Sequence, residues 1–405
     1  MTAHILVIAD GRSPTARSWI ANIQALDYKV SLVSTFACDP PDGLANFYIV
    51  PIAFSRLSSP PPSNITNAPT ATSPVIPRSF IQRFSPLFQT LRYWTGPLTL
   101  FRFGVIYQRL VREINPNLIH ALRIPFEGML GSYTPPEFPF LVATWGNDLT
   151  LHADSSPLMR AFTRRTLKRA DGLTADTHRD IRLAQPWELS PNAPTLVVPG
   201  SGGLDLEAIH NAQDFDPQPY HIPTQCDWVI NPRGLRPGSV HQDVFFASIP
   251  QVLKDHPNTC FICPGLAGNV QSQSWVDRYG IGKHTFLLPK LPQQVLWSVM
   301  KRSQLYVSPS SHDGTPNSLL EAMACGCFPV VGDIESLREW VKHQENGWLV
   351  DPKNPQELAK GICQALEMPE LRQKATDDNL DLVKERVERK VTRPRINTFY
   401  QQFIS

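Results

Sequence analysis

Two acidic residues flank a short turn in the second half of the chain, within the stretch SHDGTPNSLLEAMACG. Asp313 precedes the turn, and Glu321 follows inside a run of strong helix formers. Pro316 suits the first turn of a helix, where a missing N–H has no partner to lose. The first N–H groups of a helix have no intrahelical acceptors, and the helix dipole adds about half a positive charge there. The pattern predicts an anion-binding turn made of Gly314, Thr315, Pro316, Asn317 and Ser318.

The positions of the two carboxylates indicate a ligand class. Asp313 lies on the loop before the helix and Glu321 lies within the helix, so their side chains can contact opposite ends of one ligand. Such a ligand has phosphate in its middle and hydroxyls at both ends, as a nucleotide-sugar does. The alternative is a structural turn in which Asp313 caps the helix and Glu321 is solvated.

The surrounding elements alternate between strand and helix, which predicts two doubly wound α/β halves. HILVIAD, a helix over about 15–26 and KVSLVSTF form a parallel unit at the start of the chain. The order restarts at WVINPRG and continues through TCFICPG and TFLLPK to LYVSPS. No GxGxxG follows either opening strand, which argues against a nicotinamide dehydrogenase. We place the first domain at 1–205, the second at 206–385, and a C-terminal helix that crosses back to the first domain at 386–405.

The stretch 303–351 is similar to the donor-site signature of GT-B glycosyltransferases, and specifically of glycosyltransferase family 4. That family carries an acid, G-x-P, L-E-A-M-A-x-G, PVV and G-x-L-V-x-P, which appear here as DGTPNSLLEAMACG, FPVV and NGWLVDP. The family's two acids are usually both Glu, whereas the first is Asp313 here. The resemblance implies the GT-B fold, in which two Rossmann-like domains face each other across a cleft.

The same resemblance assigns roles in donor binding. It implies that Arg233, just after WVINPR, neutralises the donor diphosphate, that Glu321 holds ribose hydroxyls and that Asp313 holds the sugar's hydroxyls. The family's accompanying Lys is missing, because position 238 is Gly. Arg236 and Lys290 are the two candidates to replace it.

Further candidates lie in the first half of the chain. WGND matches a family loop that usually reads H-G-x-D, with Trp145 in place of the His, and the resemblance implies that Asp148 contacts the donor sugar or the acceptor. The alternative is a buried aromatic residue and an Asp that caps a turn. His120 ends a strand that we expect to face the same cleft. Gly11 and Arg12 lie at the carboxyl end of the first strand, where open α/β sheets bind ligands, although this turn also suits a simple helix cap.

Composition excludes several other classes. The 405 residues carry a net charge of +2, which provides no footprint for binding nucleic acid. There is no long apolar run and no signal-peptide pattern, so we expect a cytoplasmic protein, soluble or peripheral on the membrane. The seven scattered cysteines fit a reducing compartment.

We expect no metal and no cofactor. The acidic triplet at 214–216, DFD, lies in a proline-rich crossing rather than at a strand end. Cys260 and Cys263 form a C-x-x-C inside a probable β-run, where core packing is the better interpretation than a metal or redox site. A helix N-terminus and an arginine can neutralise a diphosphate without a metal ion.

Together these features predict a glycosyltransferase, and the family resemblance implies that it is retaining and hexosyltransferase-like. Its donor is a nucleotide-sugar, and its acceptor is a hydroxyl of a glycan, a cell-surface polysaccharide or a lipid-linked molecule. Two alternatives stay open: a GT-B epimerase, and a non-catalytic sugar-nucleotide-binding protein. The second is favoured by the missing Lys at 238 and by Trp145.

One stretch, 79–112, indicates contact with an anionic membrane surface. It interleaves eight aromatic residues with five arginines and contains no acid, a composition that suits the lipid headgroup boundary. The alternative is a helix that buries its aromatic residues in the first domain and leaves its arginines in water. The preceding Pro-, Ser- and Thr-rich stretch, 56–79, predicts a mobile surface loop.

Overall fold

A computed structural model of the chain describes residues 2–55 and 85–404. The Pro-, Ser- and Thr-rich loop predicted at 56–79 and the beginning of the aromatic–arginine stretch lie outside these residues. The chain divides into two compact units. Unit 1 comprises residues 1–203 and 392–405, and unit 2 comprises residues 204–391. The sequence analysis placed these boundaries at 205/206 and 385/386.

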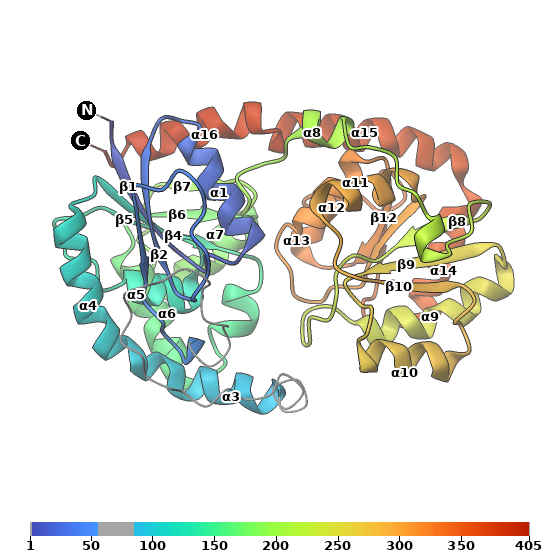
Figure 1. Cartoon of the computed structure of the whole chain (residues 1–405), viewed down its shortest axis with the longest axis horizontal. Helices are drawn as coiled ribbons and strands as arrows, with labels where there is room; N and C mark the ends of the chain where they lie inside the picture. The colour runs from blue at the N-terminus through green and yellow to red at the C-terminus, as the bar shows by residue number, and fades with distance from the viewer. Residues whose placement is uncertain (1, 56–84, 405) are drawn as a thin grey trace. The chain divides into compact units, whose positions relative to one another are not determined.

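Unit 1 is built on a seven-stranded parallel sheet with the order β3-β2-β1-β4-β5-β6-β7 (Figure 1). The strands are β1 (His4–Ala9), β2 (Lys29–Ser34), β3 (Asn46–Ile49), β4 (Leu118–Ala121), β5 (Phe140–Thr144), β6 (Gly172–Ala175) and β7 (Thr195–Val197). The main helices are α1 (Pro14–Gln24), α3 (Ser85–Thr95), α4 (Thr99–Ile114), α5 (Met129–Gly131), α6 (Pro157–Arg169), α7 (His178–Ala184) and most of α16 (Arg389–Gln401).

Unit 2 contains a six-stranded parallel sheet with the order β10-β9-β8-β11-β12-β13. The strands are β8 (Asp227–Ile230), β9 (Thr259–Pro264), β10 (Thr285–Leu288), β11 (Leu305–Ser308), β12 (Phe328–Gly332) and β13 (Trp348–Val350). The helices are α8 (Leu206–His210), α9 (Gln242–Asp255), α10 (Val270–Tyr279), α11 (Gln293–Arg302), α12 (Asn317–Ala324), α13 (Glu335–Arg338), α14 (Pro355–Glu367) and α15 (Pro369–Val387).

Both faces of each sheet are packed, as the continuous apolar strands predict. All six residues of β1 are buried, and they alternate between two cores. Leu6 and Ile8 pack on one face of the sheet, while Ile5 and Val7 pack on the other. In both sheets the strand order reverses beside the first strand of the unit, which creates a switch point where loops diverge and ligands bind.

Helix α16 returns the end of the chain to unit 1, where Figure 1 shows it near α1. The Trp19 indole N–H donates to the Tyr400 hydroxyl at 3.0 Å, and the Arg393 guanidinium donates to the Asn22 side-chain oxygen at 2.7 Å. These bonds fix α16 against α1. Among the described helices, none combines the length and apolarity needed to cross a bilayer.

The cysteines include one pair that the sequence did not indicate. Cys226 and Cys260 form a disulfide. Cys226 directly precedes β8, and the pairing of β8 with β9 brings it beside Cys260 across 34 positions of sequence. The other member of the C-x-x-C, Cys263, is a buried core residue.

Candidate functional site

The predicted anion-binding turn lies in unit 2, between β11 and α12. Pro316 is the N-cap residue of α12, and its side chain has no group that can cap the helix. Leu319, Leu320 and Met323 are buried and anchor the helix in the core of the unit. Gly326 follows the helix with a φ of 86°, a backbone conformation that favours glycine. The turn from 309 to 316 is therefore held between a buried strand and a buried helix.

Arg233 reaches this turn from the loop after β8. Its guanidinium forms an ion pair with the Asp313 carboxylate, and its Nη1 donates to the Ser318 hydroxyl at 3.2 Å. The backbone N–H of Arg233 is held by the Asn231 side-chain oxygen at 3.2 Å, and Asn231 is in turn paired with Gln242 of α9. Although burial opposes the charge, the Asp313 carboxylate raises the pKa of Arg233. Arg233 is a permanent, pre-positioned cation next to the helix N-terminus.

The guanidinium of Arg233 has hydrogen-bonding capacity that the protein does not use. Its Nε is buried and makes no hydrogen bond within the described part of the chain. A buried donor without an acceptor costs about 1–3 kcal/mol. A ligand oxygen at this position would satisfy it.

Residues that follow β12 also hold the anion-binding turn in place. The Ser336 hydroxyl donates to the carbonyl oxygen of Asp313 at 2.7 Å, and the Trp340 indole N–H donates to the Thr315 hydroxyl at 2.8 Å. Gly314, Thr315 and Pro316 are all buried. The predicted turn is thus rigidly supported by the segment that follows β12.

Glu321 occupies the same helix, three residues after Ser318. Residues three apart on a helix share a face, so Glu321 projects on the side where Ser318 meets Arg233. The Glu321 side chain accepts a hydrogen bond from the Gln293 amide at 2.7 Å. Burial, partly offset by Gln293 and Trp297, raises the pKa of Glu321 to about 7. The solvated Glu of the alternative interpretation is therefore excluded, because only 8% of this residue is exposed.

The two candidates for the missing Lys have different positions. Arg236 lies in the loop between β8 and α9, close in sequence to Arg233, and is exposed. Lys290 is also exposed and follows β10, the edge strand of the sheet. Position 238 is a glycine with a φ of 78°, which a lysine would adopt only with strain. The backbone at position 238 therefore does not suit a lysine.

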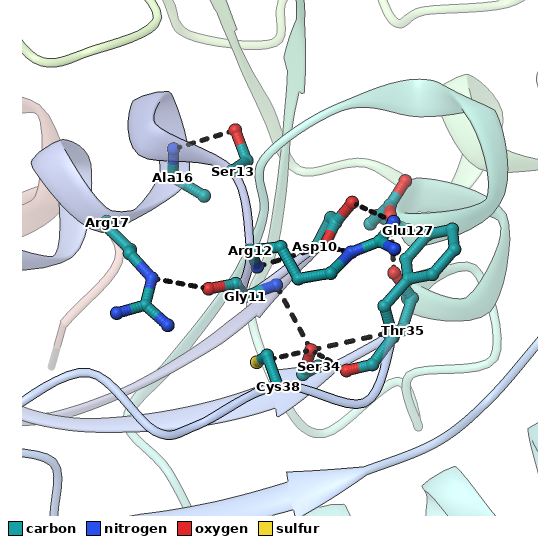
Figure 2. Close-up of polar contacts among 11 residues, drawn as sticks. Asp10, Gly11, Arg12, Ser13, Ala16, Arg17, Ser34, Thr35, Cys38 and Glu127 are labelled. Atoms are coloured by element: carbon teal, nitrogen blue, oxygen red, sulfur yellow. Dashed lines mark hydrogen bonds and ion pairs between the residues drawn. The ribbon is translucent and has the colours of Figure 1, made fainter. Parts of the chain in front are cut away.

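In unit 1, Gly11 and Arg12 lie at the carboxyl end of β1 (Figure 2). The Arg12 guanidinium donates to both oxygens of Asp10, at 3.0 and 2.9 Å. The Gly11 N–H donates to the Ser34 hydroxyl at 3.1 Å, and a Cβ at this position would lie 2.6 Å from the Cys38 sulfur. Only glycine fits this turn. Ser13 also caps α1, as the simpler interpretation predicted.

The structure corrects the role expected for Asp148. Its carboxylate is 0% exposed and accepts hydrogen bonds from the Arg123 guanidinium at 2.9 Å and from the backbone N–H groups of Ile124 and Trp145 at 3.1 and 3.2 Å. Both oxygens are thus committed to the protein. Asp148 positions the loops after β4 and β5 and does not reach a ligand. Trp145 remains partly exposed next to it.

The expectation for His120 is also corrected. His120 is 0% exposed within β4. Its Nδ1 lies 2.7 Å from the Tyr400 hydroxyl, and its Nε2 lies 3.2 Å from the Thr174 hydroxyl. Burial lowers the pKa of His120 to about 3, so the ring is a neutral core residue. The sequence showed that His120 ends a strand, but not that β4 is covered there by α16.

Sequence reasoning missed the residues that complete these sites. Gln293 and Trp340 hold Glu321 and Thr315, and Arg123 holds Asp148. The only available signal for them was their position directly after strands or early in helices. Each acts through a contact distant in sequence, which local spacing does not reveal.

Comparison with known proteins supports this geometry. Residues 238–379 match the family described as "Glycosyl transferases group 1". This segment contains the turn and Glu321, and covers less than half of the chain.

Two sequence relatives align over short segments. An uncharacterized glycosyltransferase of Methanocaldococcus jannaschii is 28% identical over 123 residues, which is 29% of this chain and 30% of the relative. The N,N'-diacetylbacillosaminyl-diphospho-undecaprenol alpha-1,3-N-acetylgalactosaminyltransferase of Campylobacter jejuni is 35% identical over 74 residues, or 18% of this chain and 20% of the relative. The chain thus aligns with less than a third of the length of these relatives.

Two solved structures match nearly the whole chain. Sucrose-phosphate synthase from Thermosynechococcus elongatus has a TM-score of 0.73 and 15% identity, covering 99% of this chain and 98% of the other. Anabaena HepE in complex with UDP has a TM-score of 0.69 and 14% identity, covering 99% and 100%. With the two parallel α/β sheets, these matches confirm that the chain has the GT-B fold.

Proposed function

We propose that this protein is a retaining glycosyltransferase that moves a sugar, of the hexosyl type, from a nucleotide-sugar to a hydroxyl acceptor. One observation carries the proposal: Arg233, Asp313 and Ser318 meet at the N-terminus of α12, with Glu321 on the same helix. The match of residues 238–379 to group 1 glycosyl transferases supports it. So does the similarity to a protein solved with UDP, which makes a uridine nucleotide the first donor to test.

In this proposal the diphosphate of the donor lies against Arg233 and the first N–H groups of α12. Negative charge develops on the diphosphate as the glycosidic bond breaks, and fixed dipoles and a cation stabilise it without reorganisation. Arg233 already carries one carboxylate partner, Asp313. An incoming phosphate would share the guanidinium fork, which frees Asp313 to accept hydrogen bonds from sugar hydroxyls. Glu321 would accept hydrogen bonds from the ribose hydroxyls.

The proposed chemistry needs no metal ion and no cofactor. Arg233 and the helix N-terminus supply the positive charge that a metal would otherwise supply, and Arg236 or Lys290 adds to it at the exposed side. Retention follows from the family resemblance, with attack on the face from which the leaving group departs. The leaving diphosphate is the base nearest to the incoming hydroxyl in that geometry.

We propose in addition that the acceptor is lipid-linked and that unit 1 rests on the cytoplasmic face of an anionic membrane. Five apolar residues recur at spacings of three and four along α3, the short turn Gly96–Leu98 and α4, and each is at least 50% exposed: Leu91, Trp94, Leu98, Phe101 and Val105. We call this set the apolar stripe.

Arg102 and Arg109 are exposed beside the apolar stripe, and Trp94 lines a surface pocket with Arg160 and Arg164 of α6. Exposed apolar residues rimmed by arginines suit an anionic lipid surface. A sequence relative acts on a diphospho-undecaprenol substrate.

The central test replaces Glu321 by its neutral isostere. Glu321→Gln should weaken binding of the donor by about tenfold or more, because it removes charged hydrogen bonds to hydroxyls. A thermal-shift screen of nucleotide-sugars, with UDP-sugars first, identifies the donor. Transfer and donor hydrolysis are then measured in EDTA, because the proposal requires no metal.

Glu385→Gln is the matched control, since Glu385 is exposed on α15 of the same unit. Donor affinity and turnover that are unchanged in Glu321→Gln would contradict the proposed function. So would a screen in which no nucleotide-sugar raises the melting temperature of the wild-type protein.

A further inference from the structure

Three arginines from different elements converge at the carboxyl end of the sheet in unit 1. Arg12 follows β1, Arg123 follows β4, and Arg92 belongs to α3. Strands β2, β1, β4 and β5 are neighbours, so their following loops share one edge of the sheet. This edge includes the switch point between β1 and β4, which is the usual ligand position in an open α/β sheet.

Two phenylalanine rings hold the guanidinium groups together. The Arg12 Cζ lies 3.6 Å from the centre of the Phe36 ring, and the Arg92 Cζ lies 5.2 Å from the same ring. Arg92 is also 4.5 Å from the centre of the Phe126 ring. Both rings are nearly buried, at 5% and 4% exposure. Arg12 and Arg92 are thus held against aromatic rings, a contact that leaves the edges of the guanidinium available for hydrogen bonds.

Two carboxylates of the cluster are already paired with its own arginines. Asp10 pairs with Arg12, and Asp148 pairs with Arg123. Glu127, which Figure 2 shows near the end of the Arg12 side chain, accepts a hydrogen bond from the Thr35 hydroxyl at 2.6 Å. Burial raises the pKa of Glu127, while Arg123 and Arg92 act in the opposite direction.

Arg92 has no such partner. Its Nε is buried and makes no hydrogen bond to the side chains described, those of residues 2–55 and 90–404. The Nε of Arg123 is likewise buried and makes no hydrogen bond to any described residue. Burial lowers the pKa of Arg92, with Glu127 acting in the opposite direction. A desolvated guanidinium without a hydrogen-bond acceptor is costly, and a ligand oxygen would reduce this cost.

Arg12 and Arg123 keep this cluster accessible. Their side chains are 37% and 32% exposed, whereas the carboxylate of Asp148 below them is fully buried. A ligand can therefore reach the guanidinium groups from solvent without displacing a core residue. Several arginine forks that approach from different elements suit a phosphate, whose oxygens point in several directions, better than a planar carboxylate.

We propose that Arg12, Arg92 and Arg123 bind a phosphate group of the acceptor. The identification of the ligand as the acceptor rests on the proposed function, whereas phosphate binding at this cluster does not depend on it. The same helix that carries Arg92 carries Leu91 and Trp94 of the apolar stripe, each at least 50% exposed. This placement favours a lipid phosphate, with its chain on the stripe, over a free phosphorylated sugar.

The test measures phosphate binding by the full-length protein in two arms. The first arm titrates inorganic phosphate and follows binding by calorimetry. The second follows cosedimentation with neutral phosphatidylcholine vesicles that contain or lack a polyprenyl phosphate. Repeating both arms in an Arg233→Gln background removes the guanidinium of the proposed donor site.

Arg92→Gln should weaken phosphate binding by at least about tenfold, because it removes charge-assisted hydrogen bonds. Arg92→Lys should retain most of the affinity. Arg12→Gln changes a partly exposed side chain that follows β1, and it should also weaken phosphate binding. Arg278→Gln, which alters an exposed arginine of α10 in unit 2, is the control and should have no effect. An Arg92-dependent affinity in the first arm supports a free phosphate, and one confined to the second arm supports a lipid phosphate.

Two results would overturn the inference. One is phosphate affinity that Arg92→Gln and Arg12→Gln leave unchanged in both arms. The other is an equal loss in Arg278→Gln, which would indicate a diffuse charge effect. In the wild-type background, affinity for the nucleotide-sugar should be unaltered in Arg92→Gln and Arg12→Gln, so a failure of the donor-site proposal is recorded separately by Glu321→Gln.

Discussion

Glu321 combines a charge with a buried position, and this combination distinguishes a binding residue from a packing residue. The side chain is 8% exposed and has the Gln293 amide as its hydrogen-bond partner. One amide does not replace the hydration of a carboxylate, so burial raises the pKa to about 7. Glu321 is therefore partly protonated near neutral pH, and a ligand that donates hydrogen bonds from hydroxyls would favour its charged form.

This shift makes the stability of the protein depend on pH. The pKa of Glu321 is higher in the folded protein, about 7, than the ordinary value of 4.5. Between these values the folded state binds a proton that the unfolded state has lost, so the free energy of unfolding falls as pH rises. The full difference is about 3 kcal/mol. Glu321→Gln should remove this component, and urea unfolding from pH 4 to 8 measures it as the difference between wild type and variant. A constant difference across this range would show that the carboxyl group is not perturbed.

Residue types and residue environments were predictable to different degrees. Arg233, Asp313 and Ser318 were predicted to share a site from their motif, and the structure brings them together. His120 and Asp148 were chosen by type and position, but both are fully buried. Burial of a polar side chain depends on partners such as Tyr400 and Arg123, which are distant in sequence and follow no spacing rule.

At the scale of elements, the anion-binding turn depends on close packing between neighbouring strands. Ser310 forms a bridge with Val240, and Ser311 donates from its backbone N–H to the Ser239 carbonyl oxygen at 2.9 Å. These bonds join the loop after β8 to the loop after β11. The geometry of Arg233 and Asp313 is therefore set by backbone contacts as well as by side chains.

Gly332, at the end of β12, provides a test of this packing. A Cβ there would lie 2.2 Å from the Ser310 carbonyl oxygen and 3.1 Å from the Pro352 Cβ. Gly332→Ala should destabilise the protein by about 1–3 kcal/mol through overpacking, and should weaken donor binding because Ser310 belongs to the turn. Gly282→Ala is the control, since its Cβ would meet only the Val276 side chain at 3.6 Å. Thermal unfolding and donor titration measure the two effects. Similar stability in both variants would exclude this role for the close contact.

The elements themselves were largely predictable, because their patterns are local. The helix expected over about 15–26 is α1 (Pro14–Gln24), and Gly326 ends α12 as expected. Strand β3 (Asn46–Ile49) was not predicted, because its four residues are only partly buried at the sheet edge and lack a strong apolar pattern. The alternation of strands and helices predicted the fold class, but this local pattern does not show which loops contact one another.

At the scale of the whole molecule, the distribution of exposed apolar residues differs between the units. The apolar stripe lies on α3 and α4 of unit 1, beside Arg102 and Arg109. In unit 2 the most exposed large apolar residue is Val270, at 84%, on α10. Tyr107, in contrast, is fully buried on the other side of α4, so this helix is anchored in its unit while the stripe faces solvent. Both interpretations of the aromatic–arginine stretch are therefore partly right, because α4 packs into the unit and also exposes apolar residues.

The last prediction concerns the apolar stripe. The double variant Trp94→Ser, Phe101→Ser should reduce cosedimentation with anionic vesicles by about tenfold or more, because each side chain contributes about 1.5–3 kcal/mol when it leaves water. Val270→Ser is the matched control, since it removes a more exposed apolar residue from unit 2 and should have no effect. Added salt should weaken binding of the wild type, because Arg102 and Arg109 attract anionic headgroups through a screened interaction. Equal recovery of the wild type with neutral and anionic vesicles, or equal losses in Val270→Ser and the double variant, would contradict a membrane role for this face.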